Sequence, residues 1–239
     1  GATPSADTTT TGKAFEHIVL TGGYPEMLQR RDPVRRTEWA RNYLRAIVQR
    51  DVRDVASVDK LGQMPRLLRV LAQHSGQLVN YTQVGGQLGL DAKTARKYIG
   101  VFQQLFLVRA LEPWSANRLT RLVKTPKLHF LDSGLLAVLL AVSEATVATR
   151  RKTFGAVLES FVFAEISKLA GWEHDDYHLY HYRDKDQDEV DVVIENVMGG
   201  IVGVEVKAAA TVNAADFRGL RKLAGACGDR FRCGLVLYD

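Results

Sequence analysis

The last third of the chain changes its hydrophobic periodicity in a way that restricts the fold more than any other feature. Apolar side chains recur at helical spacing over residues 155–170, and three strand-like segments follow at 179–183, 189–194 and 201–207. A helical segment at 214–226 and a last strand-like segment at 232–238 complete the series. These periodicities predict the order αβββαβ. We therefore expect a domain of the α+β or α/β class in this part of the chain.

The composition is that of a globular protein. Of 239 residues, 46% are hydrophobic and 25% are charged, which fits one or two folded domains. The longest apolar run, Leu135 to Val142, is eight residues, shorter than the roughly 18 that a membrane-spanning helix needs. No charged-then-apolar leader opens the sequence, and Cys227 and Cys233 are too few for a disulfide framework. We expect a soluble cytoplasmic protein that does not contact a membrane.

Charge is distributed unevenly along the chain. Residues 65–127 carry ten basic and two acidic side chains, whereas residues 155–195 carry three basic and eleven acidic ones. The balances are +8 and −8, which the net charge of +5 conceals. The first segment suits a polyanionic partner and the second suits cations. Two modules with different functions are indicated, although solvated charged faces would produce the same pattern.

Pattern and composition divide the chain into five parts. The predicted parts are a disordered arm or cloning remnant (1–12), a helical connector (13–64), a winged helix (65–142), a linker (143–154) and the αβββαβ domain (155–239).

Residues 34–55 predict a long amphipathic helix. Six arginines lie between its apolar positions: Arg35, Arg36, Arg41, Arg45, Arg50 and Arg53. They could hold phosphate, but a face exposed to solvent or to a missing partner domain is the favoured interpretation. A homo-oligomer formed through this helix is compatible with either.

The basic middle of the chain has the outline of a winged helix-turn-helix. Pro65 suits a first helical turn, Asn80 can cap a short helix at 81–88, and Asp91 can cap a third helix. Strand-like segments at 106–114 and 127–131 surround a basic loop and would form the wing.

In such a fold the start of the third helix enters a DNA groove. The cationic and polar candidates for nucleic-acid contact are Lys93, Thr94, Arg96 and Lys97 on that helix, and Arg118, Arg121 and Lys124 in the wing. They would contact phosphates of double-stranded DNA, with binding that weakens as salt rises. The alternative is a packing or dimerisation module with a solvated basic surface.

The acidic domain carries carboxylates in the layout of the restriction-endonuclease-like fold. Asp191 lies in the second predicted strand, Glu205 and Lys207 lie in the third, and Glu159 lies in the preceding helix. Hydrolysis of a phosphodiester needs a divalent cation, and Mg²⁺, or Mn²⁺ in its place, takes carboxylate ligands. We expect Asp191, Glu205 and Glu159 to be metal ligands. Lys207 would share a face with Glu205 and orient the attacking water or stabilise negative charge.

An acid-x-Lys triplet is not specific by itself. About one is expected by chance in a chain of this composition, and Asp91-Ala92-Lys93 at a helix start is such a decoy. The predicted strand around Glu205 is what favours an active site. A structural salt-bridge cluster, or a simply solvated acidic loop at 184–189, remains an alternative. His174, His178 and His181 share no face, which favours surface or partly packed positions over a metal site.

Several spaced motifs together resemble a known protein family. They are Thr21-Gly22-Gly23-Tyr24-Pro25-Glu26, Gln49-Arg50-Asp51-Val52, Lys124-Thr125-Pro126-Lys127-Leu128, Leu131-Asp132-Ser133-Gly134-Leu135, Gly155-x-x-x-Glu159, Tyr182-Arg183-Asp184, Glu189-Val190-Asp191 and Glu205-Val206-Lys207. The chain resembles, from about Phe15 to its end, the C-terminal half of AAA+-type ATPases of bacteria and archaea that end in domain of unknown function 4143.

The resemblance implies that a P-loop ATPase domain precedes this region in the full-length protein. The Gly-Gly-Tyr-Pro segment would then end that domain's lid, near the nucleotide. Residues 10–14 only mimic a phosphate-binding loop, because Asp7 and Ala14 stand where a glycine and a Ser/Thr are required. ATP is therefore expected only through the ATPase domain. The leading hypothesis is DNA binding with Mg²⁺-dependent cleavage, and the alternative is a non-catalytic regulatory or assembly module.

Overall fold

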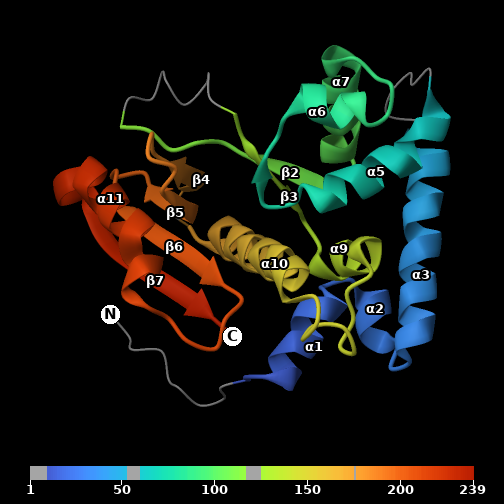
Figure 1. Ribbon diagram of the computed structural model, residues 1–239, viewed down its shortest axis with the longest axis horizontal. Helices are drawn as coiled ribbons and strands as arrows, with labels where there is room; N and C mark the ends of the chain where they lie inside the picture. The colour runs from blue at the N-terminus through green and yellow to red at the C-terminus, as the bar shows by residue number, and fades with distance from the viewer. Residues whose placement is uncertain (1–9, 53–59, 117–124, 175) are drawn as a thin grey trace.

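The chain is an α+β protein with two β-sheets, as its computed structural model shows (Figure 1). The structure describes residues 10–52, 60–116, 125–174 and 176–239. The predicted arm at 1–12 lies largely outside this part of the chain, as does the predicted basic loop of the wing. Within the described ranges, no helix is both long and apolar enough to cross a membrane.

Three helices open the described chain: α1 (Lys13–Thr21), α2 (Pro25–Gln29) and α3 (Pro33–Ala46). Asp32 caps α3, which continues as a π-helical turn, η1 (Ile47–Asp51). The predicted basic face of this helix is wrong at Arg36, which is buried and donates to the Thr21 hydroxyl and the Arg30 carbonyl. Arg36 therefore holds the first three helices together rather than facing a partner.

After the short η2 (Leu61–Gln63), the basic segment forms three helices and a small sheet. The helices are α5 (Met64–Gln73), α6 (Tyr81–Gly86) and α7 (Ala92–Gln104). The side chains of Asn80 and Asp91 cap α6 and α7, as predicted. The antiparallel sheet has the order β1 (Gln77–Leu78), β3 (Lys127–Phe130), β2 (Val108–Leu111). β2 is shorter than the predicted strand at 106–114, because Phe106 adopts a positive φ and the chain leaves the ladder after Leu111.

Helix α9 (Ser133–Leu140) ties this sheet to the first helices. Asp132 caps α9 and also accepts a hydrogen bond of 2.8 Å from the backbone N–H of Gly23. Gly22 has φ of +74°, and a Cβ there would lie 2.6 Å from the Asp132 carboxylate oxygens. The Gly-Gly-Tyr-Pro and Asp-Ser-Gly motifs thus contact each other closely, and this contact joins α1 to α9.

The second sheet has four strands in the order of the chain. Helix α10 (Arg151–Trp172) precedes β4 (Tyr177–Arg183), β5 (Glu189–Asn196) and β6 (Ile201–Lys207), and β5 pairs antiparallel with both β4 and β6. After η3 (Ala214–Phe217), α11 (Arg218–Cys227) and η4 (Gly228–Arg230), strand β7 (Phe231–Tyr238) pairs parallel with β6. α10 begins at Arg151, inside the predicted linker at 143–154.

Helices α10 and α11 pack on this sheet with different sets of side chains (Figure 1). Val204 belongs to the large core that contains the α10 side chains, whereas Ile201 packs with Leu220 and Leu223 of α11. The large core runs continuously from Val19 in α1 through both sheets. The first half of the chain therefore packs directly against α10 and the second sheet.

Candidate functional site

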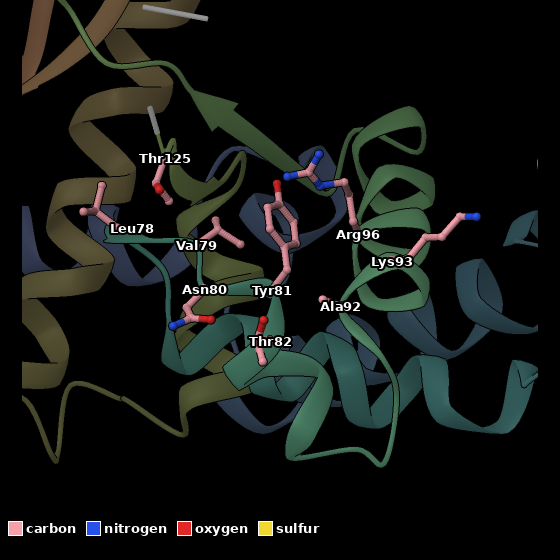
Figure 2. Close-up of a pocket in the computed structure, with 9 residues that line it drawn as sticks. All are labelled: Leu78, Val79, Asn80, Tyr81, Thr82, Ala92, Lys93, Arg96 and Thr125. Carbon is pink, nitrogen blue, oxygen red and sulfur yellow. The ribbon is translucent and has the colours of Figure 1, made fainter. Parts of the chain in front are cut away.

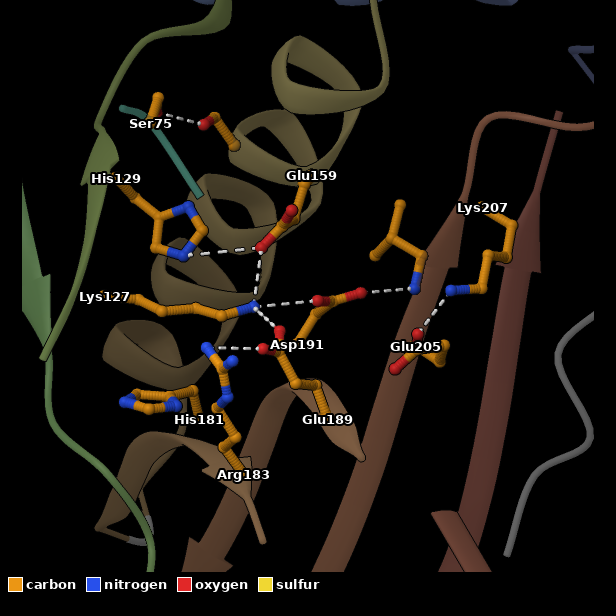
Figure 3. Close-up of polar contacts among 12 residues, drawn as sticks. Ser75, Lys127, His129, Glu159, His181, Arg183, Glu189, Asp191, Glu205 and Lys207 are labelled. Carbon is orange, nitrogen blue, oxygen red and sulfur yellow. Dashed lines mark hydrogen bonds and ion pairs between the residues drawn. The ribbon is translucent and has the colours of Figure 1, made fainter. Parts of the chain in front are cut away.

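A buried lysine is the centre of the candidate site. Lys127, the first residue of β3, has a side chain that is 2% exposed. Its Nζ lies 3.0 Å from Asp191 Oδ1, 3.3 Å from Glu159 Oε1 and 3.4 Å from Glu189 Oε2 (Figure 3). We call Lys127 and these three carboxylates the Lys127 cluster.

Three elements bring the Lys127 cluster together. Lys127 comes from the central strand of the first sheet, Glu159 from the middle of α10, and Glu189 and Asp191 from the start of β5. Because residues i and i+2 of a strand share a face, Glu189 and Asp191 reach the same ammonium. The Arg183 guanidinium of β4 lies 2.9 Å from the other carboxylate oxygen of Glu189. Charged side chains from both sheets therefore meet at the start of β5.

The pair Glu205 and Lys207 lies beside the cluster on β6. Lys207 Nζ donates a hydrogen bond of 2.6 Å to Glu205 Oε1, so both side chains occupy one face of the strand. The backbone N–H of Val206 between them donates 2.9 Å to Asp191 Oδ2. Glu205 is buried, and its Oε2 has no hydrogen-bond partner among the described residues. A free carboxylate oxygen is thus held close to the Lys127 cluster.

The electrostatics of the site reflect an excess of buried carboxylates. Burial and the neighbouring Asp191 raise the pKa of Glu159 well above its usual value, and Lys127 offsets this only in part. Burial and Asp191 raise the pKa of Glu205 in the same way, although Lys207 opposes the shift. Burial alone would lower the pKa of Lys127, but Glu159, Asp191 and Glu189 together raise it, so the ammonium stays charged.

Two buried histidines complete the surroundings of Lys127. His129 follows Lys127 on the same face of β3, and its Nε2 lies 3.8 Å from Glu159 Oε1. Burial, with the Lys127 charge, lowers the pKa of His129 to about 3 and that of His181 to about 4. Both imidazoles are therefore neutral. The prediction of a surface or partly packed position is wrong for His181, which is buried, whereas His174 and His178 are exposed.

The structure brings the four residues predicted from sequence into one region. Glu159 and Asp191 meet at Lys127, and Glu205 with Lys207 adjoins Asp191. In the described part of the chain, no three acidic, histidine or cysteine side chains are grouped so that they could hold one metal ion as they stand. Instead, the Lys127 ammonium lies between the carboxylates of Glu159 and Asp191.

Sequence reasoning missed Lys127, Glu189, His129 and His181. One signal was available: Lys127 and His129 are two polar residues at alternate positions of a short strand, next to Leu128 and Phe130. All four residues of β3 are buried, so both polar side chains need partners inside the protein. What the sequence did not contain was the identity of those partners.

The acidic loop at 184–189 is not simply solvated, which removes one alternative. Asp188 is buried and forms an ion pair with Arg218 at the start of α11. Lys222, one turn further along α11, lies 2.7 Å from Asp186 and 3.4 Å from Asp184. These pairs fix the loop that leads into β5 and so position Glu189 and Asp191.

The candidate nucleic-acid residues of the third helix lie on the first half of α7. Lys93, Arg96 and Lys97 are exposed, and the Arg96 guanidinium stacks 4.6 Å over the Tyr81 ring (Figure 2). Thr94 is occupied differently, because its hydroxyl donates 2.7 Å to Asp91 within the helix cap. Arg118 and Arg121, with Lys124, lie outside the described residues.

Comparison with protein families divides the chain in two. A family model described as a domain of unknown function, DUF8612, matches residues 12–146, which is more than half of the chain. The chain belongs to the DUF8612 family. A second model, domain of unknown function DUF4143, matches residues 154–239, which confirms this domain at the C-terminus. In this DUF8612 chain, Lys127 lies in the first matched region, and its three carboxylates lie in the second.

Two mycobacterial proteins are similar to the DUF8612 chain. Uncharacterized protein Mb2031c of Mycobacterium bovis and uncharacterized protein Rv2008c of Mycobacterium tuberculosis are each 28% identical to it over 198 residues. The matched residues are 83% of this chain but 44% of each relative, so the chain spans less than half the length of these relatives. No solved structure matches the chain.

Proposed function

We propose that this chain is the nucleic-acid-binding region of a larger ATPase and cleaves phosphodiester bonds with Mg²⁺ or Mn²⁺. The observation that carries the proposal is the convergence of Glu159, Asp191, Glu205 and Lys207 at one end of β5 and β6. Carboxylates from a helix and two adjacent strands, with a lysine two residues after one of them, support a restriction-endonuclease-like site. We therefore interpret this group of residues as a hydrolytic centre.

The oxygen donors suit a hard divalent cation. Mg²⁺ prefers carboxylate oxygens together with water and phosphate oxygens. Glu205 Oε2 is buried without a hydrogen-bond partner in the described chain. A buried polar atom normally has a partner, so this oxygen is available to bind a cation. When bound by Asp191, Glu205 and Glu159, the metal would polarise a phosphoryl oxygen and lower the pKa of a bound water.

Lys207 provides the cationic group of the proposed reaction. Its side chain is about one-third exposed and its ammonium is held by Glu205, so it can reach a phosphate bound at this site. A fixed ammonium at that position would stabilise the negative charge that develops on the phosphate oxygens. Lys207 would also orient the attacking water.

The basic first half would hold the nucleic acid. The small sheet with α5, α6 and α7 is proposed to act as a winged helix, in which α7 would be the helix that enters a DNA groove. Its exposed Lys93, Arg96 and Lys97 would contact phosphates of double-stranded DNA, so affinity should fall steeply with salt. The P-loop ATPase domain is proposed to precede this region in the full-length protein, and the longer relatives are compatible with this.

One observation favours a second function. Lys127 already forms ion pairs with Glu159 and Asp191, which suits a non-catalytic module whose nuclease fold serves as a scaffold for regulation or assembly. Such a module would bind DNA or protein partners without a metal.

A cleavage experiment separates the two functions. Double-stranded DNA is incubated with Mg²⁺ or Mn²⁺ and with wild type, Asp191→Asn or Asp229→Asn. We expect Asp191→Asn to slow cleavage by about 100-fold or more, because it removes charge from the catalytic pocket. Asp229→Asn is the matched control, since Asp229 is exposed in η4. Cleavage that is equally fast in Asp191→Asn would disprove the active site.

DNA affinity, measured on the same preparations, identifies the scaffold function. A non-catalytic module would show no metal-dependent cleavage, and its affinity would survive Glu205→Ala but fall when Arg96 and Lys97 are neutralised.

A further inference from the structure

Lys127 has no part in the proposed reaction, but its position among the carboxylates indicates a separate role. We propose that its ammonium is a displaceable internal cation that occupies the space between Glu159 and Asp191, so that a divalent metal binds only when this side chain withdraws. The inference rests on the proposed function, since it concerns the metal of the same site.

The geometry places the ammonium where an ion bridging two of the carboxylates would lie. Its Nζ is 3.3 Å from Glu159 Oε1 and 3.0 Å from Asp191 Oδ1, with the side chain 2% exposed. Figure 3 shows Lys127 reaching between the helix that carries Glu159 and the strand that carries Asp191. Two cations within a few ångströms repel strongly in a buried site. A metal held by both carboxylates and the ammonium in its present place are therefore mutually exclusive.

Buried polar atoms without hydrogen-bond partners lie near Lys127. Glu205 Oε2 has no hydrogen-bond partner among the described residues, and neither ring nitrogen of His129 has one. His129 is fully buried, and its Nε2 faces Glu159 Oε1 at 3.8 Å. Buried polar atoms are normally satisfied, so these three indicate a second state in which the pocket holds another group.

The side chain can move without unfolding the strand. Lys127 pairs with Leu78 on one side and Leu111 on the other, so its backbone is fixed in the middle of the first sheet. Its four-carbon stem has rotatable bonds, so the ammonium can leave the carboxylates by a change of side-chain rotamer while a divalent cation supplies the charge that replaces it. Withdrawal of this one side chain would leave Glu159 and Asp191 available to a metal.

The placement of Lys127 connects the metal site to the basic half of the chain. The lysine belongs to the central strand of the first sheet, whereas all three carboxylates belong to α10 and β5. A displacement of β3 away from β5 would lengthen the contact between Lys127 and Asp191. Metal affinity therefore depends on how the two halves are packed against each other.

Lysine labelling of the wild-type protein tests displacement directly. An amine-acetylating reagent is applied with and without saturating Mn²⁺, and each lysine is quantified by mass spectrometry. We expect acetylation of Lys127 to rise at least five-fold with Mn²⁺, while Lys185, which is exposed in the loop before β5, does not change. Mn²⁺ that binds without any rise at Lys127 would overturn the inference.

Calorimetric titration with Mn²⁺ provides the second arm. Lys127→Met removes the ammonium and keeps most of the side-chain volume, so we expect Mn²⁺ to bind at least ten-fold more tightly than to wild type. Adding Asp191→Asn to this variant should abolish the gain. Equal affinity of wild type and Lys127→Met overturns the inference and leaves the proposed metal site standing. Absence of Mn²⁺ binding in all variants refutes both, and if Lys127→Met does not fold, the labelling result decides.

Discussion

Neutral histidines next to a charged lysine make the site sensitive to acid at the scale of single residues. His129 and His181 are both buried near Lys127, and burial together with this ammonium disfavours their protonated forms. Protonating either ring would place a second positive charge in the same buried region. The unfolded chain has no such restriction, because each imidazole is then exposed to water.

The pH dependence of stability follows from this difference. The pKa of a histidine in the unfolded chain is about 6.5, whereas the pKa of His181 in the native protein is about 4. Between these values an unfolded His181 binds more protons than the native one, so the contribution of His181 to the free energy of unfolding falls as pH falls from 6.5 towards 4. We expect His181 alone to account for on the order of 2–3 kcal/mol of this loss.

Chemical unfolding at several pH values measures the effect. His181→Gln should remove this contribution, so that the free energy of unfolding of the variant falls less than that of wild type between pH 6.5 and 4, even though the substitution lowers stability at neutral pH. His178→Gln, at an exposed position of the same strand, is the matched control and should leave the slope unchanged. A slope that His181→Gln does not alter would contradict the assignment of a buried neutral imidazole.

At the scale of elements, the sequence predicts helices and strands well because capping residues and side-chain periodicity determine them. Asn80, Asp91 and Asp132 each cap a helix, and side-chain periodicity marks the strands of the second sheet. The candidate carboxylates were found for the same reason, since alternation along β5 and β6 fixes which side chains share a face. Lys127 was missed because its partners lie 32 to 64 positions away on other elements.

Helix α11 illustrates a contact between elements that sequence alone does not reveal. Gly219 lies so close to β5 that a Cβ would be 1.8 Å from the carbonyl oxygen of Glu189. In the same helix, a Cβ on Gly225 would meet no heavy atom within 4 Å. Gly219 is thus needed for the close packing of α11 on β5, whereas no neighbouring atom requires a glycine at position 225.

Substitution by alanine separates these two glycines. We expect Gly219→Ala to destabilise the protein by about 2 kcal/mol or more, because backbone must move to accept the methyl group. Gly225→Ala should stabilise it by roughly 0.5–1 kcal/mol through helix propensity. Thermal unfolding of both variants provides the measurement, and similar melting temperatures for the two would refute the packing argument.

At the scale of the whole molecule, the two family-matched regions share one hydrophobic core. Buried side chains of the first region, such as Leu71 and Phe130, belong to the same cluster as Phe154 and Val204 of the second. The Ser75 and Ser160 hydroxyls hydrogen-bond at 2.9 Å across this contact, and Lys127 adds its ion pairs. A shared core of this kind couples the stability of both regions, although their sequences match separate families.

Phe163 offers a direct test of that coupling. It is fully buried in α10, and its ring stacks on His129 of β3 with centroids 4.6 Å apart. We expect Phe163→Ala to cost about 3–5 kcal/mol and to lower the unfolding temperature of both regions together. Leu169→Ala, at an exposed position of the same helix, should change stability far less. Calorimetry and hydrogen exchange of the β2–β3 and β5–β6 amides measure the response. If the first sheet kept its protection while the second lost it, the two regions would be independent folding units, and Lys127 would join them only through charge.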